Sequence, residues 1–83
     1  MKKKVLLAFG CLIKSKRNHL GISQEELGFR SGLDRTYISG IERGVRNPSF
    51  TALVKIAQGL NVTTSELLNG LENFLQIKEN EEI

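Results

Sequence analysis

The side chains with the clearest chemistry are the arginines, amides and hydroxyl residues that gather between positions 24 and 49. An arginine such as Arg35 can donate two parallel hydrogen bonds to the O6 and N7 atoms of a guanine. Hydroxyl groups can donate to phosphate oxygens, and a threonine methyl can contact a thymine methyl. This combination favours contact with a nucleic acid. The candidate residues are Gln24, Arg35, Thr36, Tyr37, Ser39, Arg43, Arg46, Asn47 and Ser49.

Several of these side chains have a plainer alternative interpretation. Arg35 could contact a phosphate or only solvent, and Tyr37 could be a half-buried surface aromatic residue. Ser39 suits a phosphate as well as a base. Gln24 is expected in the first turn of a helix, where free backbone amides and the helix dipole favour a phosphate, with solvent contact as the alternative.

No pattern for catalysis or metal binding accompanies these residues. The chain has one histidine, His19, and one cysteine, Cys11, whereas a zinc site usually needs several such ligands. No spacing indicates a nucleophile elbow or a glycine loop that cradles phosphate. The sequence therefore predicts no enzyme, no cofactor and no metal, and it favours a reduced, cytoplasmic protein.

Charge is distributed unevenly along the 83 residues, whose net charge is +3. Residues 1–50 hold ten cationic and four acidic side chains, whereas residues 51–83 hold two and five. One half of the chain can therefore face a polyanion while the other half stays away from it. Double-stranded DNA is the expected partner, which would bring the cytoplasmic protein to the nucleoid.

The elements that must position these side chains are all helical, because alternating strand patterns are absent. Capping residues and glycines predict five helices. They are expected at about Val5–His19, from the capping pair Ser23 and Glu26 to Ser31, from the cap Asp34 to Arg43, from the cap Ser49 to Gly59, and over about 66–77 after a cap at Thr64 or Ser65. The sequence predicts an all-α class: a compact five-helix bundle in one domain, 1–83, whose acidic tail, 78–83, frays.

The segment Gln24–Ile41 carries a helix–turn–helix signal. Two short helices joined by a glycine turn must pack almost at right angles. Gly28 supplies the small residue where the helices approach, and Gly32 supplies the positive φ of the turn. The second helix would then fit the major groove and present Arg35 near its N-terminus.

Four segments carry a family likeness: Ser23–Leu27, Ile38–Gly44, Arg46–Pro48 and Leu67–Gly70. They resemble the small bacterial and phage regulators typified by the lambdoid repressor and Cro proteins, over roughly Leu6–Leu71. Within that family, Leu33–Arg43 is similar to controller proteins of restriction–modification systems. The resemblance implies a lambda repressor-like DNA-binding domain in a stand-alone dimer.

The resemblance also assigns Arg17 and Glu42 a structural role, because these positions form a buried ion pair in the resembled repressors. Two residues depart from the family pattern. Gly28 replaces the usual alanine, which should cost its helix about 1 kcal/mol of propensity. Gly40 lies where some repressors place a base-reading side chain, so either that contact is absent or the helix sits closer to DNA.

An apolar stripe near the C-terminus predicts a dimer interface. It consists of Leu71, Phe74, Leu75 and Ile77, which are more apolar surface than a small monomer normally exposes. The alternative is that the stripe folds back on the first helix. Two copies would read half-sites about one helical turn, near 34 Å, apart. The sequence therefore predicts a homodimeric transcriptional regulator of a pseudo-palindromic operator, acting on its own gene as a restriction–modification controller or a phage-type repressor.

A different class of function is a protein-interaction module, such as an antitoxin-like or coactivator-like protein. The acidic C-terminal half would then hold the partner protein. RNA polymerase is a further candidate partner, although no surface for it can be identified in the sequence. Lys2–Lys4 followed by Val5–Ile13 imitates a secretion signal, but this apolar stretch is short and continues at helical spacing. Neither export nor a membrane partner is expected.

Overall fold

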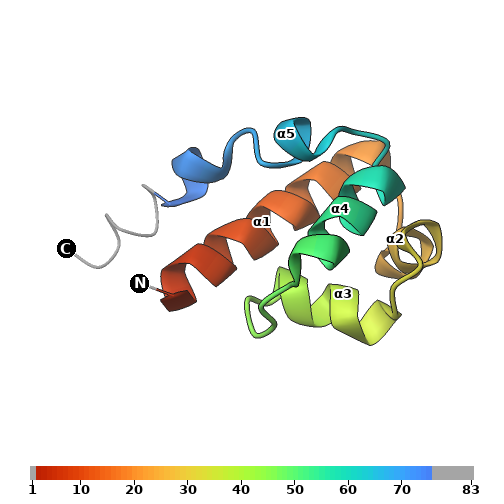
Figure 1. Ribbon diagram of the computed structural model, residues 1–83, viewed down its shortest axis with the longest axis horizontal. Coiled ribbons are helices and arrows are strands. Elements are labelled where there is room, and N and C mark those ends of the chain that lie inside the picture. Colours follow the sequence, from red (N-terminus) through yellow and green to blue (C-terminus); the bar gives the residue numbers. More distant parts are fainter. Residues whose placement is uncertain (1, 76–83) are drawn as a thin grey trace.

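The computed structural model describes residues 2–75 and contains five labelled helices (Figure 1). They are α1 (Lys2–Leu20), α2 (Gln24–Ser31), α3 (Arg35–Glu42), α4 (Phe50–Gly59) and α5 (Thr64–Leu67), and residues 71–75 add a further helical stretch. The described residues contain no strand, which confirms the predicted all-α class. α1 begins at Lys2 rather than near Val5. None of these helices is both long and apolar enough to cross a membrane.

Three side-chain caps fix where the middle helices begin. The side-chain oxygens of Ser23, Asp34 and Ser49 accept hydrogen bonds from first-turn amides of α2, α3 and α4 at 3.0, 2.8 and 3.1 Å. A cap of this kind stabilises a helix by about 1 kcal/mol. Only half of the expected capping box at Ser23 forms, because the Glu26 carboxylate accepts from Arg30 Nε at 2.9 Å instead.

The core draws apolar side chains from every helix. α2 packs on both α3 and α4, α3 packs on α1, and α5 packs on α4. The buried cluster consists of Phe9, Leu12, Ile13, Leu27, Ile38, Ile41, Ile56, Ala57, Leu60 and Leu67. Because both helices of the helix–turn–helix pair contribute buried residues to this cluster, α3 is held in place on the outside of the bundle (Figure 1).

Two glycines allow backbones to approach more closely than a side chain would permit. A Cβ atom at Gly28 would lie 2.7 Å from the carbonyl oxygen of Leu33, so the close approach predicted at the helix–turn–helix corner is present. This packing gives a physical reason for glycine at a position where the family usually has alanine. Gly10 in α1 was not singled out by the sequence, yet its Cβ would lie 2.5 Å from the carbonyl oxygens of both Ile41 and Glu42.

The predicted C-terminal helix over 66–77 is wrong in its boundaries. Thr63 caps α5, in a reciprocal capping box with Glu66 whose two hydrogen bonds measure 2.8 and 3.0 Å. α5 ends at Leu67, and Gly70 adopts a φ of +96°, outside helical geometry. The apolar spacing that indicated one helix is therefore divided between α5 and the stretch 71–75.

Candidate nucleic-acid interface

The exposed end of α3 is its N-terminal turn. Ile38 and Ile41 point into the core and are almost completely buried, which fixes the rotation of the helix about its axis. Arg35 and Thr36 are therefore exposed. Tyr37 and Ser39, the other two candidates on this helix, are half-buried. α3 thus offers an arginine and a threonine at the end that a recognition helix presents to base edges.

Asp34 organises the tip of α3 and restricts what Thr36 can do. The backbone amide of Thr36 donates to Asp34 Oδ1 at 2.8 Å, and its hydroxyl donates to the same oxygen. These hydrogen bonds, that of the hydroxyl foremost, lower the pKa of the Asp34 carboxyl below its usual value. Because the Thr36 hydroxyl proton is directed at Asp34, the methyl group of Thr36 and the lone pairs of its hydroxyl oxygen are the parts left for a base.

The beginning of α2 lies beside Arg35. A shallow polar recess is lined by Gln24, Arg35 and three neighbours, which are Arg17, Ser23 and Glu25. The side chain of Gln24 does not point freely into solvent, because its Nε2 donates to Glu42 Oε1 at 3.0 Å. The second N–H of its Nε2 and the first-turn amides of α2 are the donors that an anion could reach.

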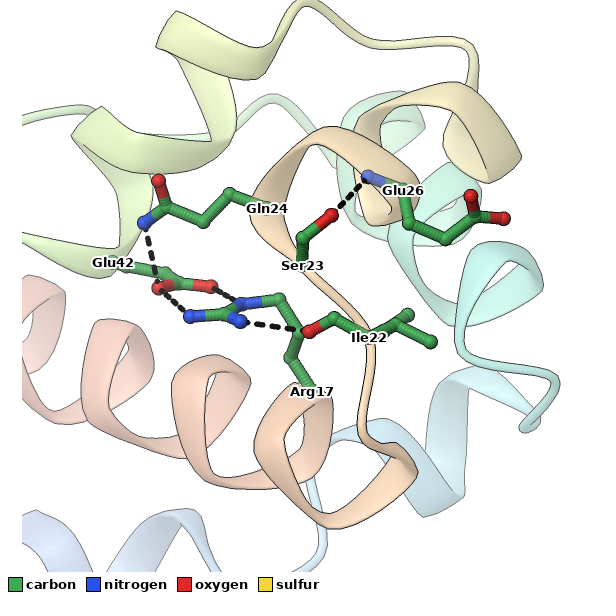
Figure 2. Close-up of polar contacts among 6 residues, drawn as sticks. All are labelled: Arg17, Ile22, Ser23, Gln24, Glu26 and Glu42. Atoms are coloured by element: carbon green, nitrogen blue, oxygen red, sulfur yellow. Dashed lines mark hydrogen bonds and ion pairs between the residues drawn. The ribbon is translucent and has the colours of Figure 1, made fainter.

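Arg17 and Glu42 form the ion pair that the resemblance implied; the pair joins α1 to α3, and Gln24 links α2 to it (Figure 2). Arg17 Nε and Nη2 donate to the two carboxylate oxygens at 2.7 and 3.0 Å, and Nη1 donates to the Ile22 carbonyl at 2.8 Å. Each residue of the pair is only 9% exposed. The hydrogen bonds to Glu42 raise the pKa of Arg17 above its usual value despite the burial. The sequence did not indicate that Gln24 and Ile22 would join the pair.

The segment after α3 carries four of the remaining candidates. Arg43, Arg46, Asn47 and Ser49 are all exposed. Ser49 uses its hydroxyl as the α4 cap and also contacts Thr51 Oγ1 at 3.2 Å. The cationic and amide side chains at the exit of α3 therefore lie along one continuous stretch of chain.

Gly40 does not lie on an open face of α3, which corrects one expectation from the sequence. It is buried, and a Cβ atom there would lie 2.5 Å from Arg46 Cγ. The amides of Val45 and Arg46 both donate to the Gly40 carbonyl, at 3.0 and 3.2 Å. The chain after α3 thus folds back, and the stem of Arg46 covers Gly40.

The apolar residues expected at a dimer interface are partly engaged within their own chain. Leu71 and Phe74 pack against the core while remaining part-exposed, Leu75 is half-buried, and Ile77 lies outside the described residues. Two large apolar side chains that the sequence did not single out are far more exposed: Phe29 at 83% and Phe50 at 75%. Phe29 follows Leu27 by two residues, a spacing that places it on the opposite side of α2.

Comparison with known proteins defines the class. The family model described as helix-turn-helix matches residues 13–67, more than half of the chain. The protein therefore belongs to the helix-turn-helix family of transcriptional regulators. The relatives described next include controller proteins of restriction–modification systems, a smaller group of regulators within this class.

Among curated proteins, the chain is 42% identical over 69 residues to control protein C.MunI of a Mycoplasma species, covering 82% of this chain and 93% of the relative. It is 41% identical over 70 residues to control protein C.BamHI of Bacillus amyloliquefaciens, covering 83% and 86%.

Solved structures agree with these sequence relatives. The crystal structure of the restriction–modification controller protein C.AhdI from Aeromonas hydrophila matches with a TM-score of 0.73 and 45% identity, over 75% of this chain and 94% of that one. A chain of the controller protein C.Esp1396I, from the crystal structure of its tetramer in complex with its natural 35-base-pair operator, matches with a TM-score of 0.80 and 39% identity, over 87% of this chain and 95% of that one.

Proposed function

We propose that this protein is a sequence-specific DNA-binding regulator of transcription that acts as a homodimer on a pseudo-palindromic operator and controls its own gene. The observation that carries the proposal is the exposed pair Arg35 and Thr36 at the tip of α3, beside the start of α2. The cationic half of the chain contains both elements. The operator complex of the related controller C.Esp1396I supports this assignment.

The candidate residues divide into base-reading and backbone-binding groups. Arg35 reads a guanine, and the methyl group of Thr36 contacts a thymine. Gln24, Tyr37, Ser39 and Ser49 approach phosphates, those at the starts of α2 and α4 with the help of first-turn amides. Arg43, Arg46 and Asn47 hold the backbone at the exit of α3 or enter the neighbouring minor groove.

Dimerisation supplies the specificity that one helix–turn–helix lacks. A single copy reads only a few base pairs, whereas two copies read half-sites about one helical turn apart. The part-exposed surfaces of Leu71, Phe74 and Leu75, together with Ile77, form the contact between the copies. Since dimerisation and DNA binding are coupled, the concentration of the protein itself sets how much operator is occupied, which suits control of its own gene.

Selection of bound duplexes from a random pool tests the proposal. The expected product is an inverted repeat whose half-sites lie about one turn apart. Arg35→Ala should then cost about 1–3 kcal/mol of binding free energy and relax the preference at one base pair. Arg46→Ala should weaken all duplexes alike and lower the slope of log affinity against log salt by about 1.

Lys55→Ala is the matched control, because it also removes one positive charge but lies on α4 in the acidic half of the chain. It should leave the salt slope unchanged. If Arg35→Ala and Arg46→Ala both bind selected and random duplexes as the parent does, the assignment is wrong. A stoichiometric protein captured in a pull-down, with no duplex bound, would favour a protein-interaction module instead.

A further inference from the structure

We propose that Gly40 and Tyr37 are positioning residues, which together form a seat that holds the guanidinium of Arg46 ready for a DNA phosphate. This inference rests on the proposed function, because it concerns how one side chain of that interface is oriented before DNA binds. Three contacts define the seat: packing of the Arg46 stem on Gly40, anchoring of its backbone by the Gly40 carbonyl, and a cation–π contact of its guanidinium with the Tyr37 ring.

The first contact requires glycine at position 40. A Cβ atom there would lie 2.5 Å from Arg46 Cγ, and 3.5 and 3.6 Å from its Cβ and Cδ. The aliphatic stem of Arg46 therefore lies directly on the α-carbon of Gly40. Because the obstructed atom is Cγ, near the root of the side chain, any larger residue would force Arg46 to rotate out of this position as a whole.

The second contact fixes the backbone that carries Arg46. The Gly40 carbonyl accepts from the amides of Val45 at 3.0 Å and Arg46 at 3.2 Å. Gly44, with a φ of +76°, makes the reversal that brings these amides back to α3. Gly40 of α3 therefore holds both the side-chain stem and the backbone of Arg46.

The third contact orients the guanidinium. Its central carbon lies 5.4 Å from the centroid of the Tyr37 ring, within the range of a cation–π contact. A cation–π contact uses no acceptor oxygen, so it does not occupy the N–H donors of the guanidinium. Arg46 therefore keeps a donor edge for a phosphate while its rotations are already restricted, and less conformational freedom is lost when DNA binds.

The test is a set of double-mutant cycles on the duplex selected above. Gly40→Ala should lower affinity by about two- to tenfold, the range expected when one long side chain must be ordered on binding. Its salt slope should stay at the parent value, because no charge is removed. In an Arg46→Ala background, the same Gly40→Ala change should cause no further loss.

Tyr37 is tested by comparing two replacements, since its hydroxyl is itself a phosphate candidate. Tyr37→Phe keeps the ring, whereas Tyr37→Leu removes it. When Arg46 is present, Tyr37→Leu should bind the duplex about two- to fivefold more weakly than Tyr37→Phe. When each variant is combined with Arg46→Ala, the two double variants should bind with equal affinity. Thermal unfolding of every variant checks that the bundle is intact, and the Tyr37 cycle stands if Gly40→Ala fails to fold.

The outcomes separate this inference from the proposed function. If the parent binds no duplex, the proposed function fails and the inference fails with it. If the parent binds but Arg46→Ala has no effect, the seat is refuted alone. The seat is also refuted if Gly40→Ala binds as the parent does, or if it weakens binding equally with and without Arg46.

Discussion

Replacement of Glu42 by leucine should remove a large part of the stability of this protein. The Glu42 side chain is only 3% exposed and that of Arg17 only 11%. In Glu42→Leu the guanidinium would retain one described partner, the Ile22 carbonyl, and would remain largely out of water. Breaking a buried pair in this way costs about 3–5 kcal/mol. An 83-residue domain is stable by only about 4–12 kcal/mol in total.

Urea unfolding followed by circular dichroism measures this loss, and thermal unfolding gives a second readout. A loss of this size should lower the melting temperature by at least about 12 °C, since each kcal/mol is worth about 4–8 °C in a domain of this length. The exposed pair between Glu26 and Arg30 is a control within the same molecule. Glu26→Gln should cost only about 0.3–0.5 kcal/mol.

The double variant Arg17→Met with Glu42→Leu separates the lost attraction from the burial of an unpaired charge. With both charges gone, stability should return to within about 1.5 kcal/mol of the parent, because apolar replacements of similar size avoid the desolvation penalty. A double variant as unstable as Glu42→Leu would refute this reasoning. So would a Glu42→Leu protein that is no less stable than Glu26→Gln.

Three further changes test separate contacts. Gly10→Ala should destabilise the fold by about 1–3 kcal/mol in urea unfolding, because its Cβ would press on two α3 carbonyl oxygens; a gain in stability would contradict the close contact of α1 with α3 at this residue. Ser31→Ala should stabilise by about 0.5–2 kcal/mol, since the buried hydroxyl has no hydrogen-bond partner among the described residues; a loss would reveal a partner. The lowered pKa of Asp34 means that the stability it contributes is complete above its unfolded value and is lost as pH falls through the lower folded value. As the pH is lowered from about 5 to about 3, Asp34→Asn should therefore lose less stability than the parent. Equal losses of stability, or an NMR titration that gives Asp34 its usual pKa, would contradict the Thr36 hydrogen bonds.

Features that depend on a few neighbouring residues could be predicted from the sequence. The caps Ser23, Asp34 and Ser49 each bond to an amide two or three residues away, so their effect can be recognised locally. Gly32 in the turn has the expected positive φ of 67°. The pairing of Arg17 with Glu42 spans 25 residues, and it was accessible only through the family resemblance.

Features that depend on how distant backbones meet could not be predicted in the same way. In the sequence, Gly10 is an ordinary interruption of a helical stripe, and its role emerges only when α3 is placed against it. Gly40 was assigned to a DNA-facing surface because helical periodicity does not show that the chain returns to cover it. The apolar spacing beyond Leu67 continues across Gly70, so periodicity did not show the turn at residues 68–70, in which Gly70 has a positive φ, between α5 and the stretch 71–75.

The hydrogen bond from Gln24 to Glu42 joins the first turn of α2 to the last turn of α3. Through Arg17, the same cluster is attached to α1, so the two helices of the motif cannot tilt separately. The relative orientation of α2 and α3 is then fixed, so a duplex that fits these helices poorly must bend or change its groove width to bind. Pliable pyrimidine–purine steps would therefore be favoured even at base pairs that no side chain reaches.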